Sequence, residues 1–373
     1  MVDPAHDQLR TPGGADPAGM PPGPWLLVVG MHRSGTSALT GACAALGLQA
    51  PSVDDRMDWP ESNPEHWESL ALALHDDALL HHLEGSWDAP PDLPPGWELG
   101  SAIRPVPPPG PAAARAYPEP GPLVWKDPRA CLLLPYWRRV LPSPPAALLV
   151  WRPPMAVARS LRARDGLALA HGLALWERYN RSALENLAGV DTYVVDYDAL
   201  LDDPGPELGR IAAWISGLAP FAPFAGSWEP GAMAAHLSSG LRHQSGDTED
   251  ELVLPSQRRL AAILAGLGGG HRPLDAGILP PESGWTTALI EGQRALWLRT
   301  RRVGTLEDEV NRLRGASPVT ATAGPPAPGA GAGPPAPGDG EGATWSLDAL
   351  AGRLRGVLRR LDGDRTRGAA GSG

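Results

Sequence analysis

Cysteine, long apolar runs and excess positive charge are all scarce in this 373-residue chain. Its two cysteines, Cys43 and Cys131, lie within runs of small or apolar residues, which excludes a disulfide framework and predicts reduced core residues. No apolar run reaches the roughly 18 residues of a membrane span, and the N-terminus lacks the apolar core of a signal peptide, so we expect a cytoplasmic protein. The net charge of −10 argues against a nucleic-acid partner, and an anionic ligand therefore needs a local cluster of cations.

A metal-ligand spacing is also missing. Histidines and aspartates do gather in one predicted helix, but their spacing matches no known metal site, and a solvated helix face is the favoured interpretation. The residues are His75, Asp76, Asp77, His81 and His82. We predict no metal.

A glycine-bounded loop stands out among the features that are present. Trp25–Val29 is apolar and predicts a buried strand, Gly30 to Gly35 follow, and a helix is predicted from Thr36 or Ser37 to Gly47. The two glycines keep the Walker spacing G-x-x-x-x-G, but Thr36 stands where the Walker lysine should be. This favours a ligand with a 5′-phosphate group over ATP, with a ligand-free βα turn as the alternative.

Two further predicted strands end in cations. Leu123–Trp125 leads into Lys126-Asp127-Pro128-Arg129, and Ala146–Trp151 leads into Arg152. Cations directly after buried strands are seldom there for packing, so Lys126, Arg129 and Arg152 are expected to serve the ligand site.

Repeated strand and helix units define the fold class. Residues 84–121, rich in proline and tryptophan, are expected to be ordered but irregular. A helix begins at Pro153-Pro154 and carries Ser160, a second helix is predicted from Gly166 to Leu187, and a fourth strand is predicted at Tyr193–Val195. We predict an α/β, P-loop-containing nucleotide-binding fold with a central parallel sheet flanked by helices and a C-terminal helical appendage. The carboxyl ends of the strands would bring the loop and the cations to one edge.

Composition divides the chain into five predicted segments: residues 1–23 as a disordered tail, 24–284 as the α/β domain, 285–315 as a helix with a short heptad pattern, 316–343 as an Ala/Pro/Gly-rich linker, and 344–373 as a basic amphipathic helix and tail. The heptad pattern, from Leu289 to Val310, predicts either pairing with another helix or packing on its own domain. The basic helix predicts contact with an acidic membrane surface or a partner, or docking on the domain. A homo-oligomer or a membrane-surface contact through these C-terminal helices is thus expected.

These motifs, over residues 25–218, resemble those of the sulfotransferases that use 3′-phosphoadenosine 5′-phosphosulfate (PAPS), especially bacterial and tyrosylprotein-type members. Arg33-Ser34-Gly35-Thr36-Ser37 is similar to their 5′-phosphosulfate loop, and Lys126-Asp127-Pro128-Arg129 to a lysine-bearing segment. Arg152 and Ser160 resemble the pair that holds the 3′-phosphate. The resemblance implies sulfuryl transfer to a hydroxyl or amine of a small-molecule or glycan acceptor, a carbohydrate or a secondary metabolite, with Arg33 and Lys126 stabilising developing charge and PAPS as co-substrate without a metal.

The general base is less clearly marked. Cytosolic members have a lysine where Arg33 stands and use a histidine base that has no counterpart here. In the tyrosylprotein branch a glutamate downstream of the loop is the base, and the matching window contains Asp54, Asp55, Asp58, Glu61, Glu65 and Glu68. A helix predicted from Asn63-Pro64-Glu65 to about Leu83 explains Glu65 by the helix dipole. Glu68, which this helix would place one turn beyond Glu65 and on the same side, is favoured over Glu61 in the loop before the helix, with a purely structural role for both as the alternative.

Two other functions stay open. An ATP-dependent small-molecule phosphotransferase is opposed by the missing Walker lysine and by Arg152 with Ser160. A non-catalytic nucleotide-sensing scaffold would act through its C-terminal helix, with the loop only sensing a ligand.

Overall fold

The computed structural model describes residues 19–57, 67–237 and 248–313. The chain divides after Arg314 into two compact units, and every described residue belongs to the first. The predicted linker at 316–343 and basic helix at 344–373 lie outside the described residues. Packing already begins at Met20, inside the predicted tail, because this side chain is buried in the core.

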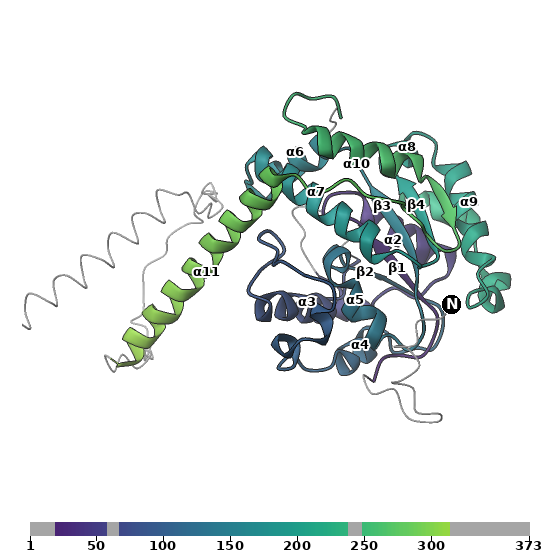
Figure 1. The fold of residues 1–373 in the computed structure, drawn as a ribbon. Helices are drawn as coiled ribbons and strands as arrows, with labels where there is room; N and C mark the ends of the chain where they lie inside the picture. Colours follow the sequence, from purple (N-terminus) through teal and green to yellow (C-terminus); the bar gives the residue numbers. More distant parts are fainter. Residues whose placement is uncertain (1–18, 58–66, 238–247, 314–373) are drawn as a thin grey trace, which may run out of the picture. The chain divides into compact units, whose positions relative to one another are not determined.

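The fold is α/β, with the elements largely where the sequence places them (Figure 1). The strands are β1 (Trp25–Val29), β2 (Leu123–Lys126), β3 (Ala146–Trp151), β4 (Thr192–Asp196) and β5 (Gly269–His271). The helices are α2 (Thr36–Leu46), α3 (Leu70–His82), α4 (Gly110–Ala116), α5 (Ala130–Val140), α6 (Pro154–Asp165), α7 (Leu169–Asn186), α8 (Tyr197–Asp202), α9 (Pro204–Ser216), α10 (Pro255–Gly266) and α11 (Gly284–Leu313).

The strands form one sheet in the order β2-β1-β3-β4-β5. The first four are parallel, which confirms the predicted parallel sheet, whereas β5 runs antiparallel to β4 at the edge. The sequence analysis did not predict β5, because Gly269-Gly270-His271 has neither the β-branched residues nor the alternation that mark a strand. This strand joins the sheet through its backbone.

Both faces of the sheet are covered by helices. Leu27 and Val29 of β1 belong to a core with α5, α6 and α7, while Leu26 and Val28 belong to a core with α2 and α9. The helices that follow β1 and β3 thus lie on opposite faces, although the two strands are neighbours. In open α/β sheets, ligands bind at such a switch point, outside the carboxyl ends of the two strands.

The helix α3 begins at Leu70, so the predicted start at Asn63-Pro64 is wrong for the described part of that segment. The Ser69 backbone is extended, and its side-chain oxygen accepts a hydrogen bond from Leu72 N at 3.1 Å, which makes Ser69 the N-cap. Glu68 therefore precedes the helix, and the prediction that it lies one turn inside it is wrong.

The prediction of a solvated face on α3 is also wrong for His75 and Asp76, which are buried. Tyr136 Oη lies 2.9 Å from His75 Nε2, and Trp137 Nε1 donates to Asp76 Oδ1 at 2.9 Å. Because α5 brings polar aromatic groups into the core, these two side chains are buried with hydrogen-bond partners.

Two further differences concern the helices α4 and α7. Helix α4 lies within the stretch 84–121 that was expected to be irregular, and α7 begins at Leu169 rather than Gly166, because Gly166 ends α6 with a φ of 70°. Cys43 and Cys131 are free and buried, as predicted. None of the described helices has both the length and the apolar composition needed to cross a membrane.

Candidate functional site

The loop between β1 and α2 has the tight backbone that its glycines predict. Arg33 and Gly35 both take the left-handed conformation, with φ of 68° and 91°, and Ser34 N donates to Met31 O at 3.1 Å. A Cβ on Gly30 would lie 2.3 Å from Val150 O, so the close approach of β3 requires glycine there. The start of the loop therefore packs directly against β3, at the switch point between β1 and β3.

An unsatisfied polar atom lies in this loop. Ser34 is fully buried, and its Oγ has no hydrogen-bond partner among the residues that the structure describes. The N-terminus of α2 follows directly, and its N-cap Gly35 offers no side-chain cap. A buried hydroxyl without a partner costs free energy, and a helix N-terminus attracts negative charge, so this loop fits an anionic oxygen.

Gly35→Ala is expected to destabilise the fold by about 3–5 kcal/mol, measured by urea unfolding. The substitution adds the strain of a positive φ and places a Cβ 2.1 Å from the Tyr197 ring. Gly166→Ala is the matched control, since Gly166 also has a positive φ but nothing within 4 Å of a Cβ, and about 1–2 kcal/mol is expected. Equal losses of stability in the two variants would show that the Tyr197 ring does not restrict the residue type at position 35.

Arg33 meets Ser160 across the switch point. Its Nε donates to Ser160 Oγ at 2.9 Å, which joins the β1 loop to the buried side of α6. Ser160, predicted to share a phosphate with Arg152, thus also contacts the glycine loop. Burial lowers the pKa of Arg33, and the neighbouring charges of Arg164 and Arg152 lower it further, which shows that cations crowd this point.

Arg152 follows β3 and is buried among partners that the sequence analysis did not assign to the site. Its Nε donates to Asp198 Oδ1 at 3.1 Å, and its Cζ lies 5.6 Å from the centre of the Tyr197 ring. Its carbonyl accepts a hydrogen bond from Trp176 Nε1 at 2.8 Å. Tyr197 and Asp198 follow β4 directly, and this strand-end position is the signal that could have identified them.

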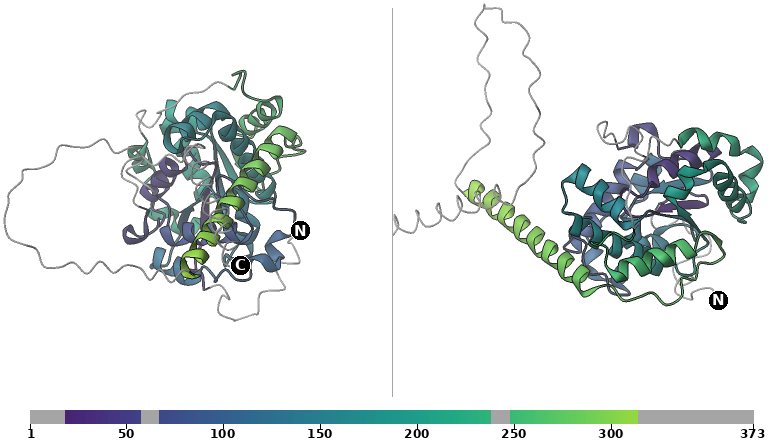
Figure 2. Two further views of the ribbon diagram at one scale, coloured as in Figure 1. Left: turned by 90° about the vertical axis from the view of Figure 1, so that its left-hand side faces the viewer. Right: turned by 90° about the horizontal axis from the view of Figure 1, so that it is seen from above.

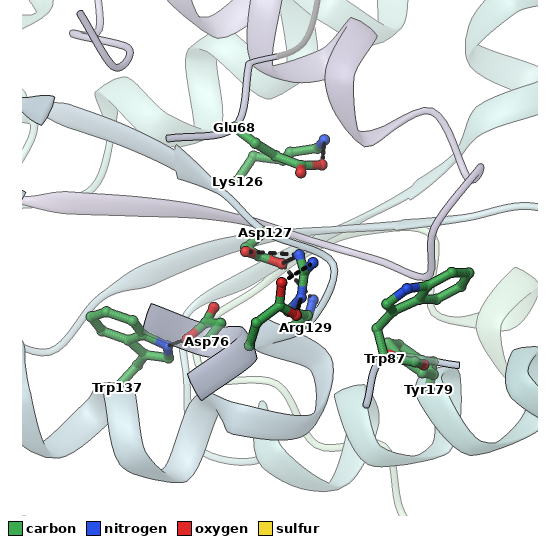
Figure 3. Close-up of polar contacts among 9 residues, drawn as sticks. Glu68, Asp76, Trp87, Lys126, Asp127, Arg129, Trp137 and Tyr179 are labelled. Atoms are coloured by element: carbon green, nitrogen blue, oxygen red, sulfur yellow. Dashed lines mark hydrogen bonds and ion pairs between the residues drawn. The ribbon is translucent and has the colours of Figure 1, made fainter. Parts of the chain in front are cut away.

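Lys126 and Glu68 form a buried ion pair. Lys126 Nζ donates to Glu68 Oε1, and the two side chains point toward each other above the sheet edge (Figure 3). Lys126 is the last residue of β2, next to β1, so its ammonium lies at the same edge as the glycine loop. In the structure, Glu68, the favoured candidate for the general base, thus lies beside the predicted site cation Lys126.

Arg129, which the sequence analysis assigned to the ligand site, is held between two carboxylates. Its guanidinium donates to both carboxylate oxygens of Asp127 and of Asp77, at 2.7 to 3.3 Å. Burial alone would lower the pKa of Arg129, but the Asp127, Asp77 and Glu68 carboxylates raise it overall. Arg129 thus forms ion pairs with both acids and links α3 to the turn after β2, as its contact with Asp127 in Figure 3 illustrates.

His32 is a buried loop residue without a predicted role. Its ring lies 4.7 Å from Trp87 and 5.9 Å from Tyr179, centre to centre, and its Nε2 has no partner within the described part of the chain. Burial lowers the pKa of His32 well below its usual value, and the surrounding cations, Arg164 first, lower it further. The imidazole is therefore neutral, and the net charge of the loop comes from Arg33.

The chain is similar in structure to two solved sulfotransferase domains. One is from the olefin synthase of Synechococcus PCC 7002, with 16% identity, a TM-score of 0.36, and coverage of 74% of this chain and 96% of that domain. The other is from the curacin biosynthetic pathway, with 14% identity, a TM-score of 0.34, and coverage of 74% and 98%. At such scores neither similarity assigns an activity. No protein-family model and no curated protein matches the chain.

The remaining predicted site residues fall into two groups. Thr36 is buried and Ser37 half-buried in the first turn of α2, beside the loop. Glu61 lies outside the described residues. Among the described residues, no group of three or more His, Cys, Asp or Glu side chains is arranged to hold a metal ion.

Proposed function

We propose that this protein is a sulfotransferase that moves a sulfuryl group from PAPS to a hydroxyl or amine of an acceptor. One observation carries the proposal: Arg33, Lys126 and Arg152 follow or end three adjacent parallel strands, around a glycine loop with an unsatisfied buried hydroxyl. Three cations and a helix N-terminus suit a ligand with negative charge at two separate places.

The donor would bind with its 5′-phosphosulfate in the glycine loop. Ser34 Oγ and the backbone N–H groups that open α2 would donate to the non-bridging oxygens, and Thr36 and Ser37 stand beside them. Arg152 and Ser160 would receive the 3′-phosphate, and the contact of Ser160 with Arg33 would link this end of the donor site to the glycine loop. A guanidinium binds a compact dianion by directional, charge-assisted bonds.

Transfer would proceed by in-line attack of the acceptor oxygen or nitrogen on sulfur. The bond between sulfur and the bridging oxygen breaks, 3′-phosphoadenosine 5′-phosphate leaves, and Glu68 takes the acceptor proton. Lys126 and Arg33 would stabilise charge on the sulfuryl and leaving oxygens. The ion pair between Glu68 and Lys126 supports this proposal, because it puts a proton acceptor beside a cation at the carboxyl edge of the sheet.

Calorimetric titration with 3′-phosphoadenosine 5′-phosphate tests the proposal without knowledge of the acceptor. We expect binding, and a ligand at 100 times its Kd should add about 2.7 kcal/mol of stability in thermal unfolding. Adenosine 5′-phosphate lacks the 3′-phosphate and is expected to bind far more weakly. Equal affinity for the two nucleotides, or binding of neither, would contradict the assignment. Incubation with PAPS and an acceptor panel then identifies the product.

Arg152→Ala is expected to weaken binding of 3′-phosphoadenosine 5′-phosphate by about 10- to 150-fold, the equivalent of about 1.5–3 kcal/mol, because a charge-assisted contact to phosphate is lost. Ser160→Ala should act in the same direction by less. Arg162→Ala is the control, since Arg162 is an exposed cation on the same helix as Ser160 and is expected to change nothing. Unchanged affinity in Arg152→Ala would remove Arg152 from the donor site.

Turnover is expected to survive a strong chelator. The donor carries no triphosphate whose outer charges need Mg²⁺, and Thr36 occupies the Walker lysine position. The rate of 3′-phosphoadenosine 5′-phosphate release, measured with and without the chelator, checks this. Complete loss that Mg²⁺ restores would favour the phosphotransferase instead.

A further inference from the structure

The helix α11 has one face that packs on its own domain. Thr286 and Ile290 are buried, and Thr286 Oγ1 donates to Glu177 Oε2 of α7 at 2.6 Å. Further along, Arg294 Nε donates to Glu84 O at 2.8 Å, just beyond the end of α3. Trp297 continues this face, with its ring 5.4 Å from His81. The helix thus lies against α7 and then beside the C-terminal end of α3.

A second apolar stripe lies on roughly the opposite side of the same helix. Leu296 is 38% exposed, Leu306 is 56% exposed, and Val303 between them is half-buried. These positions are seven and three residues apart, the spacing of a coiled-coil seam, and an ideal helix turns them away from Ile290, Arg294 and Trp297. The long single helix that presents this stripe can be followed in Figure 2.

The charged residues beside this stripe are complementary to those of a second, identical helix. With Leu296 and Val303 at a positions and Leu306 at a d position, Arg302 occupies a g position and Glu307 the next e position. In a parallel, in-register pair of helices, g of one copy faces that e of the other, so Arg302 and Glu307 would attract each other twice. Arg299 falls within the stripe, where its aliphatic stem can cover apolar surface while its charge reaches water.

We infer that α11 is a dimerisation helix that forms a parallel two-stranded coiled coil with a second copy of this chain through Leu296, Val303 and Leu306. Both charge signs flank the stripe, which suits an identical helix, whereas an acidic membrane would require a uniformly basic border. The seam is short, so the dimer is expected to depend on protein concentration. This inference is independent of the proposed activity.

Sedimentation velocity of the full chain over about three decades of concentration tests the dimer. We expect a monomer at the dilute end and a dimer at the concentrated end. Leu306→Asp should raise the dimer Kd by at least about 100-fold, because it places a charge in the seam. Leu252→Asp is the matched control, since Leu252 is also 56% exposed but lies outside α11, and it should leave the Kd unchanged. A wild-type monomer throughout, or an unaffected Leu306→Asp dimer, would overturn the inference.

Disulfide trapping tests the parallel direction. Leu296→Cys should yield a reducible covalent dimer, because residues at the start of the seam meet only when the helices are parallel and in register. Cys43 and Cys131 are fully buried and cannot replace this contact. A non-covalent dimer that fails to form the 296–296 disulfide would overturn the parallel arrangement.

Charge exchange tests the same register. Arg302→Glu and Glu307→Arg should each raise the dimer Kd by roughly 4- to 30-fold, because two attractions become repulsions. The double exchange should restore the wild-type Kd. Additive weakening in the double variant would contradict the pairing of Arg302 with Glu307.

Discussion

Glu68→Gln is expected to bind 3′-phosphoadenosine 5′-phosphate as tightly as the wild type and to lower kcat by roughly 10²–10⁴-fold. The carboxamide keeps the shape of the side chain and an oxygen that can accept from Lys126, but it cannot take the acceptor proton. The measurement pairs calorimetric titration of the nucleotide with the rate of acceptor sulfation. A loss confined to kcat identifies a group that acts in the transition state.

The control for Glu68→Gln must reproduce the loss of stability from changing a buried carboxylate to an amide, at a position away from the site. Glu177 on α7 provides it, because this residue is 2% exposed and accepts hydrogen bonds from Ser283 and Thr286. Glu177→Gln is expected to lower stability and to leave kcat unchanged. Normal turnover by Glu68→Gln together with a defective Glu61→Gln would transfer the role of base to Glu61. Full activity in both variants would exclude Glu61 and Glu68 as the base.

Arg129→Met is expected to destabilise the fold by about 3–5 kcal/mol in urea unfolding. The substitution keeps an unbranched apolar stem but leaves Asp127, which is 1% exposed, without its counter-ion. Asp77 on α3 loses its partner as well. Burial already raises the pKa of Asp127 despite the arginine, so removing that cation makes its charged form still harder to retain.

Two further variants show whether this loss comes from stranded charge. Adding Asp127→Asn to Arg129→Met should recover part of the stability, because an amide costs less to bury than an unpaired carboxylate. Arg181→Met breaks the more exposed Arg181–Glu185 pair on α7 and is expected to cost at most about 1 kcal/mol. If Arg129→Met lost no more stability than Arg181→Met, the ion pairs of Arg129 would contribute no more to the free energy of unfolding than a surface ion pair does.

The sequence by itself determined the four strands β1 to β4 and their parallel pairing. Apolar runs that end at a glycine, a cation or, for β4, an aspartate marked the first four strands, and repeated strand and helix units required parallel pairing. The glycine loop could be predicted from the sequence because few other residue types fit at Gly30, which lies against the backbone of β3, or at Gly35, which has a positive φ and lies against the Tyr197 ring. These signals are local, so no tertiary information was needed to find them.

The partners of the cations were decided only by the tertiary structure. Lys126, Arg129 and Arg152 were alike in sequence, since each follows or ends an apolar strand, yet they meet different carboxylates. Arg129 is saturated by Asp127 and Asp77, whereas Lys126 meets Glu68. Such pairs join residues far apart in the chain, and their distances depend on how α3 packs against the sheet. No periodicity in the sequence encodes that packing.

The same distinction holds for α3 and α11. The sequence predicted a helix start at Asn63-Pro64 because proline and an acid favour a first turn, but Ser69 supplies the N-cap in the folded chain. In α11 the heptad spacing was legible, but spacing alone could not tell a helix packed on its domain from one that pairs. Packing against α7 and the end of α3 fixes the buried face and leaves Leu296 and Leu306 exposed, because a helix in contact on one side keeps the opposite side in solvent.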